Sequence, residues 1–154
     1  MENFYKQGIT VIELLIVLAV LSIIFSIALP QFAKIKENQV LKNGVQDVIS
    51  SINKARGQTL ASLNSSVYGV HFQSDKVIIF KGTIFIADTV GNETISLTLP
   101  AIISTITLPG GATDFYFNRL SGTPSFIGSG TIVISTTNFN KTITISGTGG
   151  VSSN

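Results

Sequence analysis

The first part of the chain is dominated by an unbroken apolar pattern. From Ile9 to Leu29 nearly every residue is aliphatic, and only two serines, one threonine and one glutamate interrupt the run. About 20 apolar residues in a helix span the roughly 30 Å hydrocarbon core of a bilayer. A removable secretory signal is the alternative, but its apolar core is only about 7–15 residues long and is followed by a small-residue cleavage site. Pro30-Gln31-Phe32 offers no such site, so a retained membrane helix is predicted.

Beyond Pro30 the apolar residues become one-sided. From Leu41 to Leu63 they recur at intervals of three and four residues, with polar or charged residues between them. This spacing places them on one face of a helix. We therefore predict that a single helix continues past Pro30, with a transmembrane first half at residues 9–30 and an amphipathic second half at residues 31–63.

After Asn64 the pattern changes to short runs of β-branched and aromatic residues. Turn residues such as Pro109-Gly110-Gly111 separate the runs, which is typical of antiparallel strands. Residues 64–154 are thus predicted to form a β-rich globular domain, covered on one sheet face by the amphipathic helix. The expected fold class is α+β. The predicted strands are residues 68–72, 76–80, 83–87, 94–99, 102–108, 114–118, 130–135 and 141–146.

Composition narrows the classes of function. Charged residues make up 12% of the 154-residue chain, against about 25% in an average soluble domain. Lysine and arginine exceed aspartate and glutamate by only two, with 10 against 8, so charge does not indicate an acidic partner. The chain contains no cysteine, which excludes disulfides and thiolate metal sites.

Glu13 is the one acidic residue inside the apolar run. A carboxylate deep in a bilayer costs on the order of 2.5–3.5 kcal/mol and is usually paired and functional. Cleavage between Gly8 and Ile9 would create a cationic amine one helical turn away from Glu13. It would also put Glu13 in the first turn, where the helix dipole favours an anion. The alternative is a glutamate that the membrane interface merely tolerates.

The residues Gly8-Ile9-Thr10-Val11-Ile12-Glu13-Leu14-Leu15, the aliphatic run and Pro30 together resemble the class III signal of type IV prepilins and type II secretion pseudopilins. The resemblance implies that a prepilin peptidase cuts after Gly8 and N-methylates Ile9. It implies that Glu13 pairs with a neighbouring subunit's terminal amine during assembly, and that Pro30 marks a kink or melted turn in the filament. Family members usually begin with phenylalanine, and Ile9 departs from that pattern.

The resemblance also implies a topology for the membrane helix. Lys34, Lys36 and Lys42 follow the apolar run, whereas only Lys6 precedes it. Counted alone, these lysines favour a cytoplasmic location for the residues that follow the helix. The resemblance implies the reverse, with residues 1–8 as a cytoplasmic leader peptide and the remainder outside. We expect a single-pass protein of the inner membrane before assembly and a periplasmic or cell-surface filament afterwards.

The carboxy-terminal region carries a looser resemblance. The segments 117–122, 130–134 and 142–147 resemble the minor pseudopilin family that includes FimT and the H-type pseudopilins of type II secretion. Some FimT-like proteins bind DNA through arginines in the closing segment. The corresponding segment here, "SGTGGVSSN", has no arginine or lysine, so nucleic-acid binding is not expected.

No catalytic or metal-binding constellation is visible in the sequence. His71 is the only histidine, and strand alternation predicts it to be a solvated residue on the face opposite to Val70 and Phe72 rather than a zinc ligand. Asp88, Asn92 and Glu93 surround Val90-Gly91, where a turn is preferred over a calcium loop. We expect no enzyme activity and no cofactor.

These features predict a structural subunit of a type IV pilus-like filament, with a minor pseudopilin of a type II secretion system as the preferred form. The expected partners are other pilin or pseudopilin subunits, the prepilin peptidase, the inner-membrane assembly platform and the membrane itself. A minor type IV pilin for adhesion or DNA uptake is the first alternative. A membrane-anchored binding domain that never polymerises is an alternative of another class.

Overall fold

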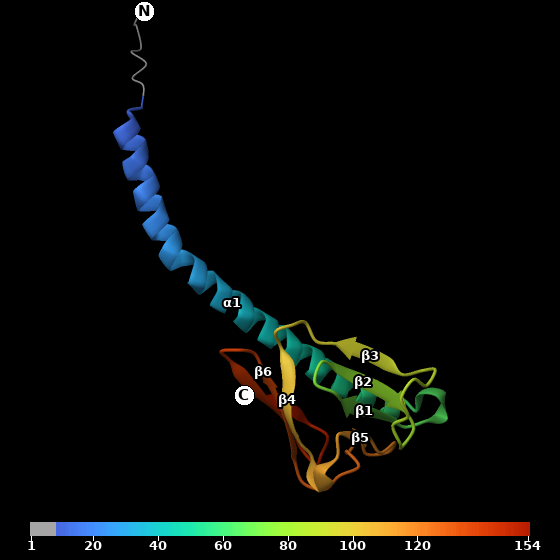
Figure 1. Ribbon diagram of the computed structural model, residues 1–154. Coiled ribbons are helices and arrows are strands. Elements are labelled where there is room, and N and C mark those ends of the chain that lie inside the picture. Colours follow the sequence, from blue (N-terminus) through green and yellow to red (C-terminus); the bar gives the residue numbers. More distant parts are fainter. Residues whose placement is uncertain (1–8) are drawn as a thin grey trace, which may run out of the picture. The chain divides into compact units, whose positions relative to one another are not determined.

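The computed structural model describes residues 9–154, and the leader peptide predicted at residues 1–8 lies outside them. One long helix is followed by strands only, in the order shown in Figure 1. The chain divides into two compact units, Met1–Lys36 and Glu37–Asn154. The elements are α1 (Val11–Leu60), β1 (Tyr68–Phe72), β2 (Lys76–Lys81), β3 (Glu93–Ser96), β4 (Ile102–Thr107), β5 (Asp114–Tyr116), β6 (Gly130–Ser135), β7 (Asn140–Ile145) and β8 (Val151–Ser153), with short 3₁₀ turns at Leu63–Ser65 and Pro109–Gly111.

Helix α1 confirms the prediction that the helix continues through Pro30. It ends at Leu60, three residues earlier than the apolar spacing predicts. The reason is local backbone geometry, because Ser62 and Asn64 have φ angles of 50° and 51°. Residues in this left-handed region stop a right-handed helix.

The strands form two four-stranded sheets, and every pairing is antiparallel. The first sheet has the order β3-β2-β1-β5, and the second has the order β4-β6-β7-β8. Alternation decides which face of each strand is buried. In β6, for example, Ile132 and Ile134 are fully buried, while Thr131 and Val133, which alternate with them, are partly exposed. The predicted α+β class is confirmed.

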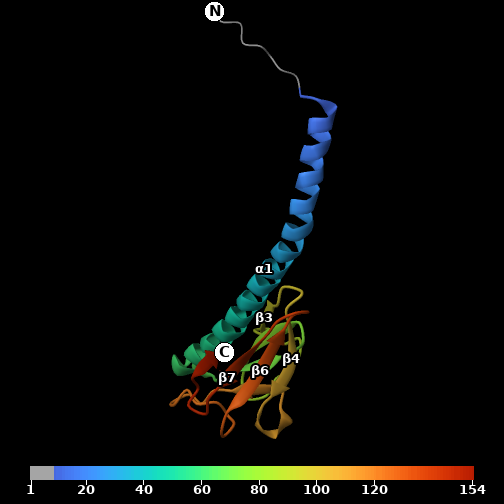
Figure 2. The ribbon, with the colours of Figure 1, turned by 90° about the vertical axis from the view of Figure 1, so that its left-hand side faces the viewer.

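One core joins the second half of α1 to the inner faces of both sheets. Figure 2 shows this half of the helix alongside the strands. The helix contributes a stripe of buried residues at helical spacing, as predicted. Gly44 belongs to this stripe, and a Cβ there would lie 3.4 Å from the Ala101 side chain and 3.6 Å from Leu97. The small residue therefore allows the segment that leads into β4 to pack closely on the helix. The helix stripe comprises Leu41, Gly44, Val45, Val48, Ser51, Ile52, Ala55 and Thr59.

The buried hydroxyl of Thr59 connects the last turn of α1 to the first strand. It donates to the Ala55 carbonyl at 2.9 Å and accepts a hydrogen bond from the Tyr68 backbone N–H at 2.8 Å. Because a buried polar group without a partner is costly, these bonds determine where β1 starts relative to the helix. The first sheet is thereby held against the amphipathic half of α1.

Two strand predictions are wrong. Residues 83–87 are predicted to be a strand but lie in the loop between β2 and β3. No strand pairs with them, because Phe85 packs on His71 and Phe80 and this loop lies over the outer face of the first sheet rather than beside its edge strands β3 and β5. Conversely, β8 is absent from the predicted strands. It has a single apolar residue, and its backbone pairs with β7 from Ile143 to Ile145. The other predicted strands are present: residues 68–72 and 130–135 have the predicted bounds, and the rest differ by one to three residues at one or both ends.

The solvated environment predicted for His71 is also wrong. Its side chain is only 14% exposed, and its ring stacks on Phe85 with centroids 3.8 Å apart. The reason is that the loop after β2 folds over the outer face of the first sheet and buries Phe80 as well. Burial lowers the pKa of His71, while the Asp114 carboxylate, 3.9 Å from its Nδ1, opposes that shift.

Glu37 fixes the loop between β6 and β7. Its carboxylate accepts hydrogen bonds from the backbone and side-chain nitrogens of Asn138, at 2.8 and 2.7 Å. These two bonds hold the pKa of Glu37 below its usual value, and the bond to the Asn138 side chain has the larger effect. A depressed carboxyl pKa stabilises the fold above the unfolded-state pKa, and this contribution is lost as the pH falls through the folded-state pKa.

Replacement of Glu37 with glutamine is therefore expected to lower stability slightly at pH 7. The difference from the unsubstituted protein should disappear as the pH falls below 4.5, the usual value for the carboxyl. Thermal unfolding of the full chain in detergent, followed by circular dichroism across this pH range, provides the measurement. Asp47→Asn, at an exposed position on the same helix, is the control for removal of a carboxylate from α1 and should leave stability at pH 7 nearly unchanged. A pH-independent effect of Glu37→Gln would contradict the role of its charge.

Candidate functional site

The amino-terminal unit presents an apolar surface. In the described part of this unit, residues 9–36, every large aliphatic or aromatic side chain is exposed. Helix α1 contains a stretch long and apolar enough to cross a membrane, and this stretch lies near the amino terminus. The hydroxyl of Ser22 donates to the Leu18 carbonyl at 2.7 Å, so its polarity is satisfied within the helix. Such a surface requires lipid or other protein around it.

Thr10 and Glu13 form the start of α1. The Thr10 hydroxyl accepts a hydrogen bond from the Glu13 backbone N–H at 3.3 Å, and the Thr10 carbonyl accepts one from Leu14 at 3.1 Å. Thr10 is therefore the N-cap and Glu13 is the third helical residue, which is the capping-box arrangement Thr-x-x-Glu. Sequence reasoning missed the role of Thr10, although this four-residue spacing is a signal for it.

The carboxylate of Glu13 remains available for another partner. Within residues 9–154 it makes no hydrogen bond and no ion pair, so the reciprocal bond of a complete capping box is not formed. A free carboxylate in the first turn lies where the positive end of the helix dipole favours it. It can therefore accept a cation without losing a contact to any of residues 9–154.

The predicted site residues have the following places in the structure. Gly8 lies outside the described residues. Ile9 is exposed and lies just before α1, and Glu13 is in the first turn, so these two residues are at the same end of the helix. Pro30 is inside α1 in the same unit, far along the helix from both.

A family model described as the prokaryotic N-terminal methylation motif matches residues 3–29. No curated protein and no solved structure gave a significant match to the chain. The motif, the apolar α1 and the α+β fold together support a membrane-anchored, pilin-like protein. They support a place in the type IV pilin and pseudopilin family, whose members are structural subunits and are processed by a prepilin peptidase.

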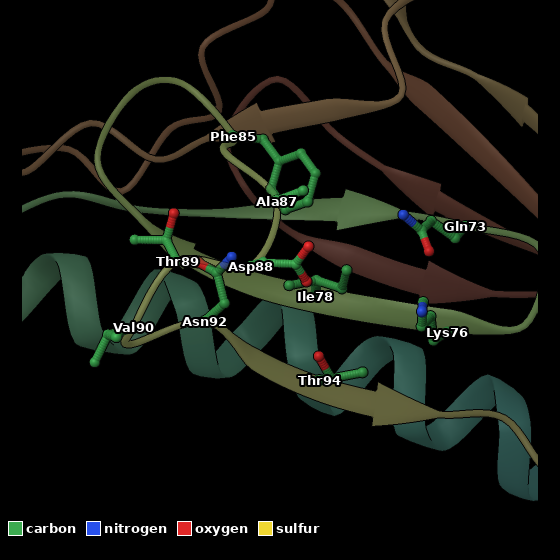
Figure 3. Close-up of a pocket in the computed structure, with 10 residues that line it drawn as sticks. All are labelled: Gln73, Lys76, Ile78, Phe85, Ala87, Asp88, Thr89, Val90, Asn92 and Thr94. Atoms are coloured by element: carbon green, nitrogen blue, oxygen red, sulfur yellow. The ribbon is translucent and has the colours of Figure 1, made fainter.

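A second feature is a cavity of about 390 Å³ on the outer face of the first sheet (Figure 3). Ile78 and Lys76 of β2 and Thr94 of β3 line it, and Phe85 and Asp88 line it from the loop above. Its polar groups come from both the strands and the loop, so the loop and the sheet form it together. No residue of this cavity is among the predicted site residues.

The acidic residues near this cavity do not converge. Glu93 is ion-paired with Lys54 of α1, while Asp88 lines the cavity on the outer face. The predicted turn at Val90-Gly91 is confirmed, with the Asn92 N–H bonded to the Thr89 carbonyl at 3.1 Å. Among residues 9–154 no group of three or more acidic, histidine or cysteine side chains is arranged for a metal ion.

Proposed function

We propose that this protein is a structural subunit of a type IV pilus-like filament, cleaved after Gly8 and N-methylated at Ile9. The methylation motif at residues 3–29 is the observation that carries the proposal. The exposed apolar surface of α1 supports it, because such a surface is covered by lipid before assembly and by neighbouring helices afterwards. The partners would be other pilin-like subunits, the prepilin peptidase and an inner-membrane assembly platform.

In this proposal the amine and the carboxylate at the start of α1 perform the assembly step. Cleavage gives Ile9 a cationic amine, and the Glu13 carboxylate, which has no partner among residues 9–154, accepts the amine of a neighbouring subunit. Pairing neutralises two charges that would each be costly in an apolar environment. Pro30 interrupts the helical hydrogen bonding at Ser26 and is the position where the helix would yield during packing.

Among such subunits we favour a minor pseudopilin of a type II secretion system. The glycine-bounded segments at 117–122 and 142–147 resemble that group. The leader at residues 1–8 would be cytoplasmic, and the globular unit would be periplasmic and then part of the filament surface.

The Thr-x-x-Glu spacing raises an alternative role for Glu13, that of closing the capping box, although its side chain does not make that bond among residues 9–154. A glutamine substitution separates this role from charge pairing. Glutamine serves at the third position of a capping box as glutamate does, but it carries no charge for an amine. If charge pairing drives assembly, Glu13→Gln and Glu13→Ala are both expected to reduce incorporation into filaments. Leaving the neighbour's amine unpaired at a cost of about 1.4 kcal/mol would lower incorporation roughly tenfold. Incorporation is measured as the ratio of sheared filament to membrane-bound protein.

Membrane insertion and cleavage of both variants should be unchanged, which makes the membrane-bound pool the internal control. Thr10→Ala is the matched variant, since it removes the cap and leaves the charge; it should assemble near the unsubstituted level. Normal assembly of Glu13→Gln together with failure of Glu13→Ala would show that Glu13 acts only as a helix-capping residue, and the pairing mechanism would be wrong.

A further inference from the structure

The loop between β2 and β3 presents an apolar surface in the globular unit. We call residues 82–91 the isoleucine loop. Ile84 is 74% exposed, Ile86 is 64% exposed and Val90 is fully exposed. Gly82 and Gly91, with φ angles of +111° and +107°, delimit the loop. Large apolar side chains gathered on one loop of a protein with few charges indicate a contact surface rather than scattered exposure.

The loop is held against the sheet by one residue. Phe85 stacks on His71 and makes an edge contact with Phe80, with ring centroids 5.6 Å apart. Phe85 is turned inward and partly buried, whereas its neighbours Ile84 and Ile86 are exposed. The two isoleucines are therefore exposed on a loop that the packing of Phe85 holds against the sheet.

The backbone at the centre of the isoleucine loop, residues 83–87, is largely unpaired. Among these five residues only the Ile86 carbonyl has partners in the described structure, namely the Thr89 hydroxyl at 3.1 Å and the Asn92 amide at 2.9 Å. No hydrogen bond within residues 9–154 involves the backbone N–H groups of residues 83–87. This segment, Thr83-Ile84-Phe85-Ile86-Ala87, has strong β propensity, so it can offer backbone and apolar contacts to another extended chain.

The charges at the ends of this segment identify the partner. Lys81 precedes it and Asp88 follows it, and no charged residue lies between them. Both are exposed, and neither forms an ion pair within the described residues. When two copies of this segment meet antiparallel about a two-fold axis near Phe85, Ile84 of each faces Ile86 of the other and Lys81 of each approaches Asp88 of the other. A parallel arrangement would bring like charges together instead.

We propose that the isoleucine loop is a two-fold contact between two copies of this chain, with Ile84 and Ile86 at its centre and Lys81–Asp88 pairs at its ends. A two-fold contact is isologous and is not generated by the screw operation that relates subunits along a helical filament. The contact therefore joins chains laterally, either as membrane-anchored pairs before assembly or between filaments. This proposal assumes that the protein is anchored in a membrane, as in the proposed function, but it does not depend on the assembly role of Glu13.

Cysteine cross-linking tests this contact directly, because the chain has no cysteine of its own. Full-length Ile84→Cys and Ile86→Cys chains with different tags are expressed together, and native membranes are treated with a mild oxidant. Opposed residues of an antiparallel pair have Cβ atoms about 4.5–5.5 Å apart, so a disulfide-linked dimer carrying both tags is expected. Ile127→Cys, at a position that is 95% exposed in another loop, is the matched control and should remain monomeric with either partner.

Charge reversal tests the orientation of the two copies. When Lys81→Glu is added to both cysteine chains, the dimer yield is expected to fall roughly threefold to tenfold, since each copy loses an exposed ion pair and gains a repulsion. The double change Lys81→Glu with Asp88→Lys should restore most of the yield. Failure of the restoration would overturn the two-fold arrangement.

The same cross-links are measured in the Glu13→Ala background, which separates this inference from filament assembly. Dimers carrying both tags in that background, with or without assembly of the unsubstituted chain, support the loop contact. No dimer between the Ile84→Cys and Ile86→Cys chains, equal yield from Ile127→Cys, or cross-linking to a different protein only would each overturn it.

Discussion

Gly8→Asp is expected to abolish maturation. In the proposed pathway the unsubstituted protein is recovered with Ile9 as its first residue, heavier by one methyl group. A peptidase site that accepts a residue without a side chain leaves no room for a carboxylate, so the variant should retain residues 1–8 and carry no methyl group. Without a free amine at Ile9, Glu13 has no partner of the expected kind, and filaments should not contain the variant. Intact-mass spectrometry of the membrane-bound protein measures this directly.

Gln7→Ala is the matched control for that experiment, because it changes the adjacent residue and leaves the glycine in place. It should be processed normally. Recovery of Gly8→Asp with an amino terminus at Ile9 would show that the glycine is incidental. An unsubstituted protein that keeps its first eight residues in cells containing the peptidase would contradict the proposed processing as a whole.

Gly69→Ala is expected to cost about 3 kcal/mol of unfolding free energy, at the upper end of the range for overpacked cores. Gly69 lies on β1, and a Cβ there would overlap the Phe80 ring and lie only 2.6 Å from the Phe115 carbonyl. The ring is 1% exposed and the carbonyl belongs to the neighbouring strand β5, which pairs with β1 at this point. Neither group can yield without disturbing the first sheet.

Gly57→Ala is the control, and it is expected to change stability in the opposite direction. Gly57 lies on an exposed part of α1, and no atom is within 4 Å of a Cβ there. Gly57→Ala should therefore raise stability by up to about 1 kcal/mol, the difference in helix propensity. Denaturant unfolding of the full chain in detergent compares the two variants. Equal effects at both positions would mean that the close packing at Gly69 is not a constraint.

The sequence was most informative where one local rule decides the structure. The alternation in residues 130–135 is that of β6, and the helical spacing after Leu41 matches the buried stripe of α1. Propensity failed at residues 83–87, because a strand must lie beside a neighbouring strand, and these residues lie over the outer face of the first sheet instead. It failed at β8 for the opposite reason, since backbone pairing with β7 stabilises a segment of low apolar content.

In the candidate site and the loop region, too, some features follow from the sequence alone and others do not. The spacing of Gly8, Glu13 and Pro30 along one chain was sufficient to propose processing and assembly, and a family model matches residues 3–29, which include the first two of these positions. The burial of His71 and the exposure of the isoleucine loop depend on how a loop folds over a sheet. Neither the course of that loop nor the order of the two sheets follows from periodicity, because both depend on contacts between residues distant in the sequence.

The shared core has a consequence for the order of events during synthesis. The buried stripe of α1 is made early, but Ile143 and Ile145, which belong to the same core, are near the end of the chain. Contacts between such distant residues form late. Until β7 has emerged, the core between α1 and the two sheets is incomplete and leaves apolar surface exposed, so a polypeptide truncated before that strand would be a target for quality-control proteases.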